Sequence, residues 1–138
     1  MAVITASDRT YTLHGTTRLT FADAVARVRE TLKEEGFGVL TEIDVQGTLR
    51  EKLDAEMEPY LILGACNPTF AHRALGLEPE LGSLLPCNVV VYEQDGATHV
   101  SVVDPVAMLG IVENPDLEPI GQQIRERLER AVEAVWNA

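Results

Sequence analysis

The dipeptide Asp95–Gly96 constrains the fold of this chain more than any other short segment. It separates two valine-rich runs of alternating residues, 87–93 and 98–103. An Asp-Gly pair between two such runs is the strongest short-range signal for a β-hairpin. A two-residue turn predicts four facing pairs: Tyr92 with His99, Val91 with Val100, Val89 with Val102, and Cys87 with Asp104.

Two further positions carry a helix-start signal. Asn67 and Asp104 each stand directly before a proline. Asn and Asp are preferred N-cap residues, and proline is well tolerated at the first position of a helix. This pattern predicts helices over 68–75 and 105–109.

Hydrophobic periodicity places the remaining elements. A helix follows Thr20, which with Asp23 resembles a capping box, and Gly36 supplies its stop. Thr48 with Glu51 forms a second capping box and predicts a short helix. Strands are predicted over 11–17, 37–45 and 60–66, the second of them half-buried, and the last helix runs from about Pro119 to the C-terminus.

This order of elements predicts an α+β fold with two layers, a mixed β-sheet of about five strands and helices packed mainly on one face. The second face of the sheet is partly apolar at Val90, Tyr92 and Val103. Such a face is often covered by a second subunit. We therefore expect a homodimer.

The composition excludes several partners. The chain has 11 Lys plus Arg against 22 Asp plus Glu, a net charge of -11, which opposes binding to nucleic acid or an anionic membrane. No apolar run approaches the roughly 20 residues that cross a bilayer, and the start of the chain lacks a signal-peptide pattern. We expect a cytoplasmic protein with one domain over residues 1–138, in which residues 1–10 can be a loosely ordered N-terminal segment.

The two cysteines, Cys66 and Cys87, are the residues most able to carry chemistry. Cys66 precedes the predicted helix N-terminus at Asn67, where peptide dipoles favour a thiolate. Cys87 instead faces Asp104, whose negative charge would raise the pKa of a nearby thiol. The two thiols share a site only if their strands are antiparallel neighbours. We predict a ligand-binding site made of Cys66, Asn67, Cys87, Asn88 and Asp104.

A metal ion is a weaker hypothesis, because zinc needs four ligands, or three and a water. His72, six residues after Cys66, is the nearest candidate to join Cys66 and Cys87 as a metal ligand. His14 and His99 fall on strand positions that are expected to be half exposed, without a partner that the sequence can name. A cysteine is also often a simple packing residue.

Four segments together resemble the bacterial and archaeal domain of unknown function 302 family. They are Gly36–Val45, Leu63–Pro68, Leu84–Val91, and Asp104 and Pro105 with Met108. The resemblance spans about Tyr11 to Met108. It implies a small α+β domain that dimerises, and it implies no settled activity.

Two functions remain open after these observations. The first is a dimeric module that binds a small anionic or metal ligand, or a partner, at the two-cysteine site. The second is a thiol-disulfide redox protein in which Cys66 is the reactive thiolate and Cys87 the resolving partner. The binding function is favoured because Cys66 has no adjacent general base and the pair lacks the close Cys-x-x-Cys spacing. The sequence leaves open whether any reaction is catalysed.

Overall fold

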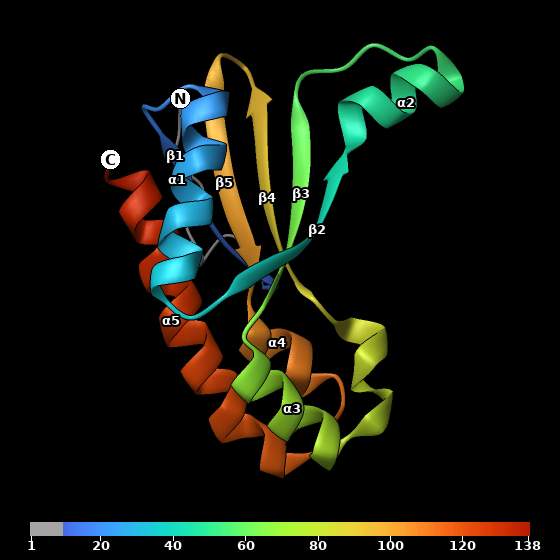
Figure 1. The fold of residues 1–138 in the computed structure, drawn as a ribbon, viewed down its shortest axis with the longest axis vertical. Helices are drawn as coiled ribbons and strands as arrows, with labels where there is room; N and C mark the ends of the chain where they lie inside the picture. Colours follow the sequence, from blue (N-terminus) through green and yellow to red (C-terminus); the bar gives the residue numbers. More distant parts are fainter. Residues whose placement is uncertain (1–9) are drawn as a thin grey trace.

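A five-stranded sheet with helices on one face forms the body of the protein (Figure 1). The computed structural model describes residues 10–138, so most of the expected loosely ordered segment 1–10 lies outside the described residues. The strands are β1 (Thr12–Thr17), β2 (Gly38–Asp44), β3 (Tyr60–Cys66), β4 (Cys87–Gln94) and β5 (Ala97–Val103). The helices are α1 (Phe21–Glu34), α2 (Val45–Leu53), α3 (Pro68–Leu77), α4 (Pro105–Gly110) and α5 (Glu118–Trp136), with 3₁₀ turns η2 (Pro79–Leu84) and η3 (Pro115–Leu117).

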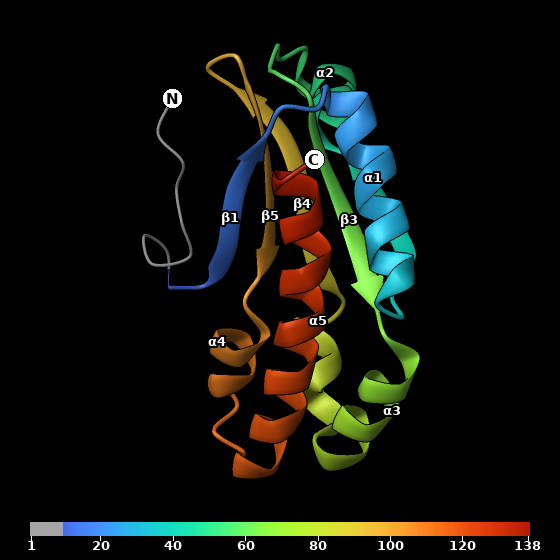
Figure 2. The same cartoon turned by 90° about the vertical axis from the view of Figure 1, so that its left-hand side faces the viewer.

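The strand order is β1-β5-β4-β3-β2, and every neighbouring pair is antiparallel. The predicted α+β class and five strands are confirmed, whereas the sheet is antiparallel where a mixed sheet was predicted. Antiparallel neighbours need only short connections, so the helices can lie beside or beyond the sheet instead of crossing between parallel strands. Figure 2 shows α1 and α5 covering one face, while α3 and α4 lie beyond one end of the sheet.

The hairpin of β4 and β5 confirms the register predicted from the turn. Val89 pairs with Val102, and Tyr92 pairs with His99. Asp95 has a φ of 53° and Gly96 a φ of 77°, the two positive values that a type I′ turn requires. The predicted pairing of Cys87 with Asp104 does not form, because β5 ends at Val103 and the Asp104 amide donates instead to the Tyr11 carbonyl oxygen at 2.7 Å.

Local capping explains most helix boundaries. The Thr20 side chain accepts a hydrogen bond from the Asp23 amide at 3.1 Å, and Gly36, with a φ of 87°, follows the end of α1. The predicted start of α2 at Thr48 is wrong. Asp44 caps this helix by accepting from the Gly47 amide at 3.0 Å, so α2 begins as soon as β2 ends.

The strand β2 differs from its predicted half-buried pattern. It is the edge strand of the sheet, and a β-bulge shifts its register between Val39 and Thr41. Val39 is half-buried, and every other residue of β2 is exposed. The alternation in the sequence was real, but an edge strand has fewer neighbours to bury its apolar side.

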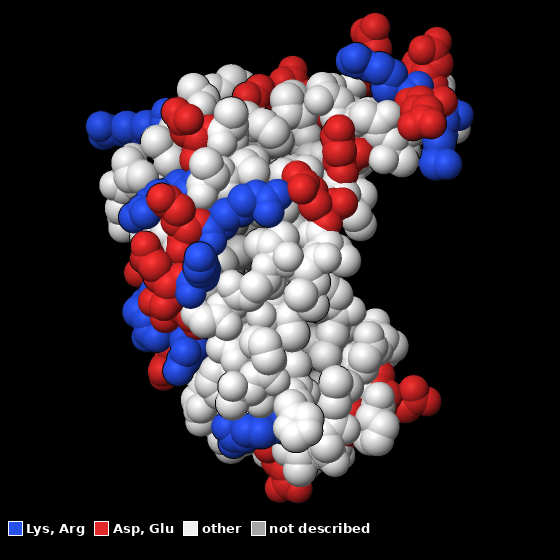
Figure 3. All heavy atoms as spheres, viewed as in Figure 1, with Lys and Arg blue, Asp and Glu red and all other residues white. Residues whose placement is uncertain are grey.

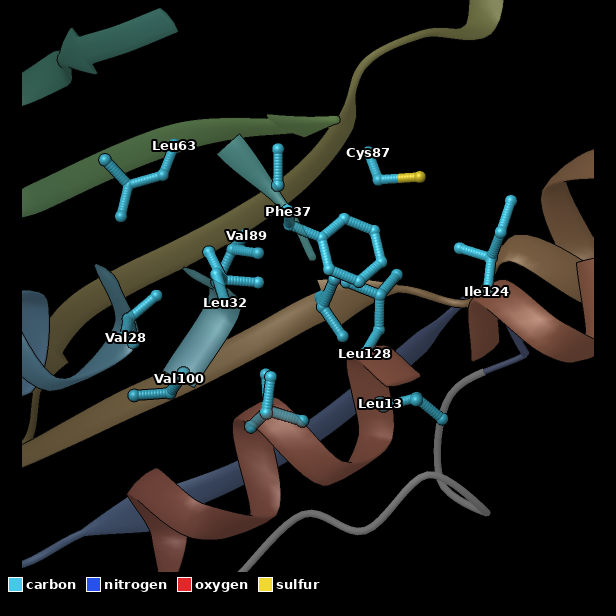
Figure 4. Packing of buried hydrophobic residues seen from close by; sticks show 14 of the residues in the cluster. Leu13, Val28, Leu32, Phe37, Leu63, Cys87, Val89, Val100, Ile124 and Leu128 are labelled. Carbon is cyan, nitrogen blue, oxygen red and sulfur yellow. The ribbon is translucent and has the colours of Figure 1, made fainter. Parts of the chain in front are cut away.

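The hydrophobic core lies between the sheet and the pair α1 and α5 (Figure 4). Leu63, Val89 and Val100 from the sheet and Leu32 and Leu128 from the helices are each fully buried. The part of the chain that the structure describes has no helix long and apolar enough to span a membrane.

The end of α5 is attached directly to the sheet. Trp136 Nε1 donates to the Val100 carbonyl oxygen at 2.9 Å. Its ring lies over Gly15, where an added Cβ would stand 2.6 Å from the ring. The glycine therefore allows the indole to lie on β1.

Candidate functional site: an apolar cavity at the end of the sheet

The two cysteines lie at the same end of the sheet but do not form a pair. β3 and β4 are antiparallel neighbours, and Cys87 stands opposite Ala65. Cys66 is the next residue of β3, and successive side chains of a strand leave on opposite faces. Both cysteines are free thiols. The antiparallel arrangement on which a shared site depended is therefore present, but the two cysteines form no disulfide.

The Cys66 thiol is less acidic than predicted, whereas the pKa of Cys87 is raised, as predicted. Asn67 does cap α3, because its Oδ1 accepts from the Phe70 amide at 3.4 Å. Burial nevertheless raises the pKa of Cys66 above its ordinary value of 9.0. Burial raises the pKa of Cys87 to about 11, and the charge on Cys66 adds a smaller upward effect. A lowered pKa at Cys66 was the basis of the redox hypothesis, so that hypothesis is not supported.

The other three residues predicted for the site are either exposed or have a structural role. His72 is exposed on α3, and within residues 10–138 no group of three metal-ligating side chains is close enough to hold a metal ion. Asn88 is exposed, and it lines a groove on the uncovered sheet face. Asp104 caps α4 through the Val106 amide at 2.9 Å, and its Oδ2 lies 3.4 Å from Arg125 Nε. The raised pKa of Cys87 therefore comes from burial, whereas the prediction attributed it to Asp104.

Cys66, Asn67 and Cys87 line a cavity of about 270 Å³ where β3 ends and β4 begins. The other lining residues come from β2, β3, α3, η2, α4, α5 and the turns beside them, and they are Phe37, Leu40, Ala65, Phe70, Ala71, Ala74, Leu75, Leu81, Leu85, Pro86, Met108, Leu109 and Ile124. The lining contains no Asp, Glu, Lys or Arg. Figure 4 shows the sulfur of Cys87 pointing toward the side on which Ile124 lies.

The cavity combines a buried floor with an exposed rim. Phe70, Leu81 and Cys87 are buried, whereas Leu40 is 68% exposed and Leu75 is 38% exposed. The Phe70 ring also makes a cation–π contact, because the Arg127 guanidinium lies 5.2 Å from its ring centroid. A small apolar molecule can therefore enter at the rim and lose its contact with water inside.

A second hollow lies on the sheet face that α1 and α5 leave uncovered. It has a volume of about 480 Å³, and His14 and Tyr92 are among its lining residues. His14 Nε2 lies 3.1 Å from His99 Nδ1, and the Tyr92 ring stacks on His99 at 4.7 Å between centroids. The prediction that these histidines are half exposed is wrong, because both are buried.

Charges gather away from the cavity. Figure 3 shows Lys, Arg, Asp and Glu along α1 and α5 and around α2, while the surface between α2 and α3 is uncharged. Several of these charges pair with each other, such as Arg29 with Glu42 at 2.8 Å and Arg130 with Glu35 at 2.9 Å. The cavity thus opens on an apolar region of an otherwise acidic protein.

Comparisons with known proteins agree with this fold. The family model "Domain of unknown function DUF302" matches residues 13–135. The crystal structure of an uncharacterized conserved DUF302 protein from Bacillus stearothermophilus is similar, with a TM-score of 0.87 and 31% sequence identity. The alignment covers 92% of this chain and 99% of that chain. No curated protein sequence matches the chain.

Proposed function

Since this chain belongs to the DUF302 family, which is defined without an activity, we propose a function from the cavity itself: binding of a small apolar molecule. The observation that supports this proposal is the lining of the cavity, which consists of apolar side chains, two thiols and Asn67. Both thiols have pKa values above the ordinary 9.0, so they are protonated at neutral pH and add no charge to the lining. An uncharged cavity that opens at an apolar rim favours an uncharged ligand.

The volume of the cavity sets the size of the ligand. An engineered apolar cavity of about 150 Å³ holds benzene, so about 270 Å³ suits roughly ten non-hydrogen atoms. At about 0.5 kcal/mol per atom, such a ligand would bind with a Kd on the order of 0.2 mM. The anionic or metal ligand considered from the sequence fits less well, because the lining offers no cation and no cluster of metal ligands among the described residues.

The same proposal includes a homodimer in the cytoplasm. Two free thiols in the described chain support a reducing compartment. Exposed apolar side chains such as Leu40 and Leu53, 68% and 71% exposed, support association with a second copy.

Titration with naphthalene, followed by NMR of the backbone amides, tests the binding function. We expect shifts at Phe37, Cys66 and Phe70, which line the cavity. Ala74→Leu fills part of the cavity and should weaken binding at least about tenfold, because the added carbons occupy the ligand's volume. Ala134→Leu makes the same change at a half-buried position of α5 outside the cavity and should leave binding unchanged. Equal Kd values for the two variants would refute the assignment of the cavity.

A further inference from the structure

The walls of the cavity differ in composition from the rest of the core. The chain has three Phe, two Cys and three Met. Two of the phenylalanines, both cysteines and one methionine line this cavity, and they are Phe37, Phe70, Cys66, Cys87 and Met108. The buried hydrophobic residues of the described chain that lie outside the cavity are all Ala, Val, Leu or Ile. Aromatic rings and sulfur atoms are therefore concentrated where the core is left open.

The two phenylalanine rings of the lining have no aromatic neighbour. Phe37 is 4% and Phe70 6% exposed, and they come from the segment before β2 and from the first turn of α3. Within residues 10–138, every contact between two aromatic rings lies on the uncovered face of the sheet, so neither phenylalanine contacts another ring. A ring of the ligand would provide that neighbour, and aromatic pairs are stabilised beyond the burial of their area.

Three sulfur-containing side chains line the same space. Cys66 ends β3, Cys87 begins β4, and Met108 lies in α4. Cys87 is buried, whereas Cys66 and Met108 are half-buried. Sulfur is polarizable and makes favourable contacts with aromatic rings, often at the ring edge. A saturated ring has no π-system, so it gains neither the contact with sulfur nor the contact with a phenyl ring.

We propose that the cavity selects an aromatic ligand over a saturated ligand of the same size. This inference rests on the proposed function and names the class of ligand, an uncharged aromatic compound of roughly ten non-hydrogen atoms. Hydrophobic burial alone favours the opposite order, because a saturated ring carries more hydrogen atoms and therefore more apolar area. The order of the two affinities thus separates recognition of an aromatic ring from simple burial.

The groove on the uncovered sheet face is the competing aromatic site. Its rings already stack on one another, with centroids 5.2 Å apart for Tyr60 and Tyr92 and 4.7 Å apart for Tyr92 and His99. Asn88 and Ser101 also line this groove. An apolar ring placed there would separate these polar side chains from water, which costs free energy. The cavity carries no such cost at its aromatic walls.

NMR titrations of the protein with 2-phenylethanol and 2-cyclohexylethanol test the preference. The two alcohols have the same number of non-hydrogen atoms and the same hydroxyl group, so they differ only in the ring. We expect both to shift the backbone amides of Phe37, Cys66 and Phe70, which line the cavity. The Kd of 2-phenylethanol should be at least about threefold lower than that of 2-cyclohexylethanol.

Two pairs of variants identify the groups responsible. Phe70→Leu removes a ring from the lining, and Phe21→Leu makes the same change at a half-buried position of α1 outside the cavity. Met108→Leu removes a sulfur atom with little change in volume, and Met57→Leu is its half-buried control outside the cavity. The ratio of the two Kd values should fall at least about twofold in the cavity variants and stay unchanged in the controls.

Each result decides a different statement. If 2-cyclohexylethanol binds as tightly as 2-phenylethanol or more tightly, the aromatic preference is overturned and the apolar cavity stands. A ratio that is equal in wild type, Phe70→Leu and Met108→Leu also overturns it, and Met108→Leu decides alone if thermal melting shows that Phe70→Leu is unfolded. Titrations in which neither alcohol shifts the cavity amides, or in which the shifts lie at His14 and Tyr92 instead, overturn the proposed function as well.

Discussion

The protonated state of Cys87 gives the sharpest chemical prediction. Burial raises its pKa from 9.0 to about 11. Near pH 8, a thiol of pKa 9.0 is about 10% thiolate and one of pKa about 11 is about 0.1%, a ratio of about 100. Because the thiolate is the reacting form, iodoacetamide should modify Cys87 about 100-fold more slowly in the folded protein than in the unfolded chain.

Single-cysteine variants allow each thiol to be measured alone. Cys66→Ala leaves Cys87 as the reactive residue and removes only the smaller cause of its shift, the charge on Cys66. Cys87→Ala leaves Cys66, whose pKa is also raised by burial. Intact mass measured over a pH series gives both rates, with the same variants in urea as the reference. If iodoacetamide modified Cys87 near pH 8 at a rate within about threefold of its rate in the unfolded chain, Cys87 would not be a buried, uncharged part of the cavity wall.

Three further predictions concern stability. The folded state holds the Cys87 proton more tightly than the unfolded state does, so protonated Cys87 contributes to the free energy of unfolding below about pH 9, and this contribution is lost as the pH rises to about 11. In urea unfolding over this pH range, the free energy of unfolding of the wild type should fall by up to about 3 kcal/mol relative to that of Cys87→Ala. Gly15→Ala should lower the free energy of unfolding by about 1 to 3 kcal/mol, because the new Cβ displaces the Trp136 ring, whereas Gly76→Ala, which meets open space, should not; equal melting temperatures would contradict this. Asp104→Ala should cost about 1 kcal/mol through the lost cap of α4, and Asp104→Asn, which keeps a capping oxygen, should cost less in the same melting experiment.

Elements set by neighbours along the chain could be predicted from the sequence. Asn67 and Asp104 cap the helices that were expected, because a cap acts on amides two or three residues away. The hairpin register followed from Asp95 and Gly96 for the same reason. The DUF302 resemblance, confirmed by the family match over residues 13–135, rested on segments of this kind.

Features that depend on distant segments could not be predicted. The cavity needs α3, η2 and the N-terminal half of α5 to meet beyond the sheet, and Phe70 and Ile124 look like ordinary core residues in the sequence. The contact between His14 and His99 joins strands 85 residues apart. The sequence placed Cys66 at a helix start, but only the structure shows that this thiol is partly buried and that burial raises its pKa.

Placement of an apolar atom in a crystal is the most direct test of the cavity. Xenon binds apolar cavities in proteins, and its anomalous scattering identifies the site without a functional assay. We predict a xenon peak between Phe70 and Cys87 in crystals under xenon pressure, and its loss in Ala74→Leu. Ordered water filling that space, with xenon absent or bound only elsewhere, would contradict a site for an apolar ligand.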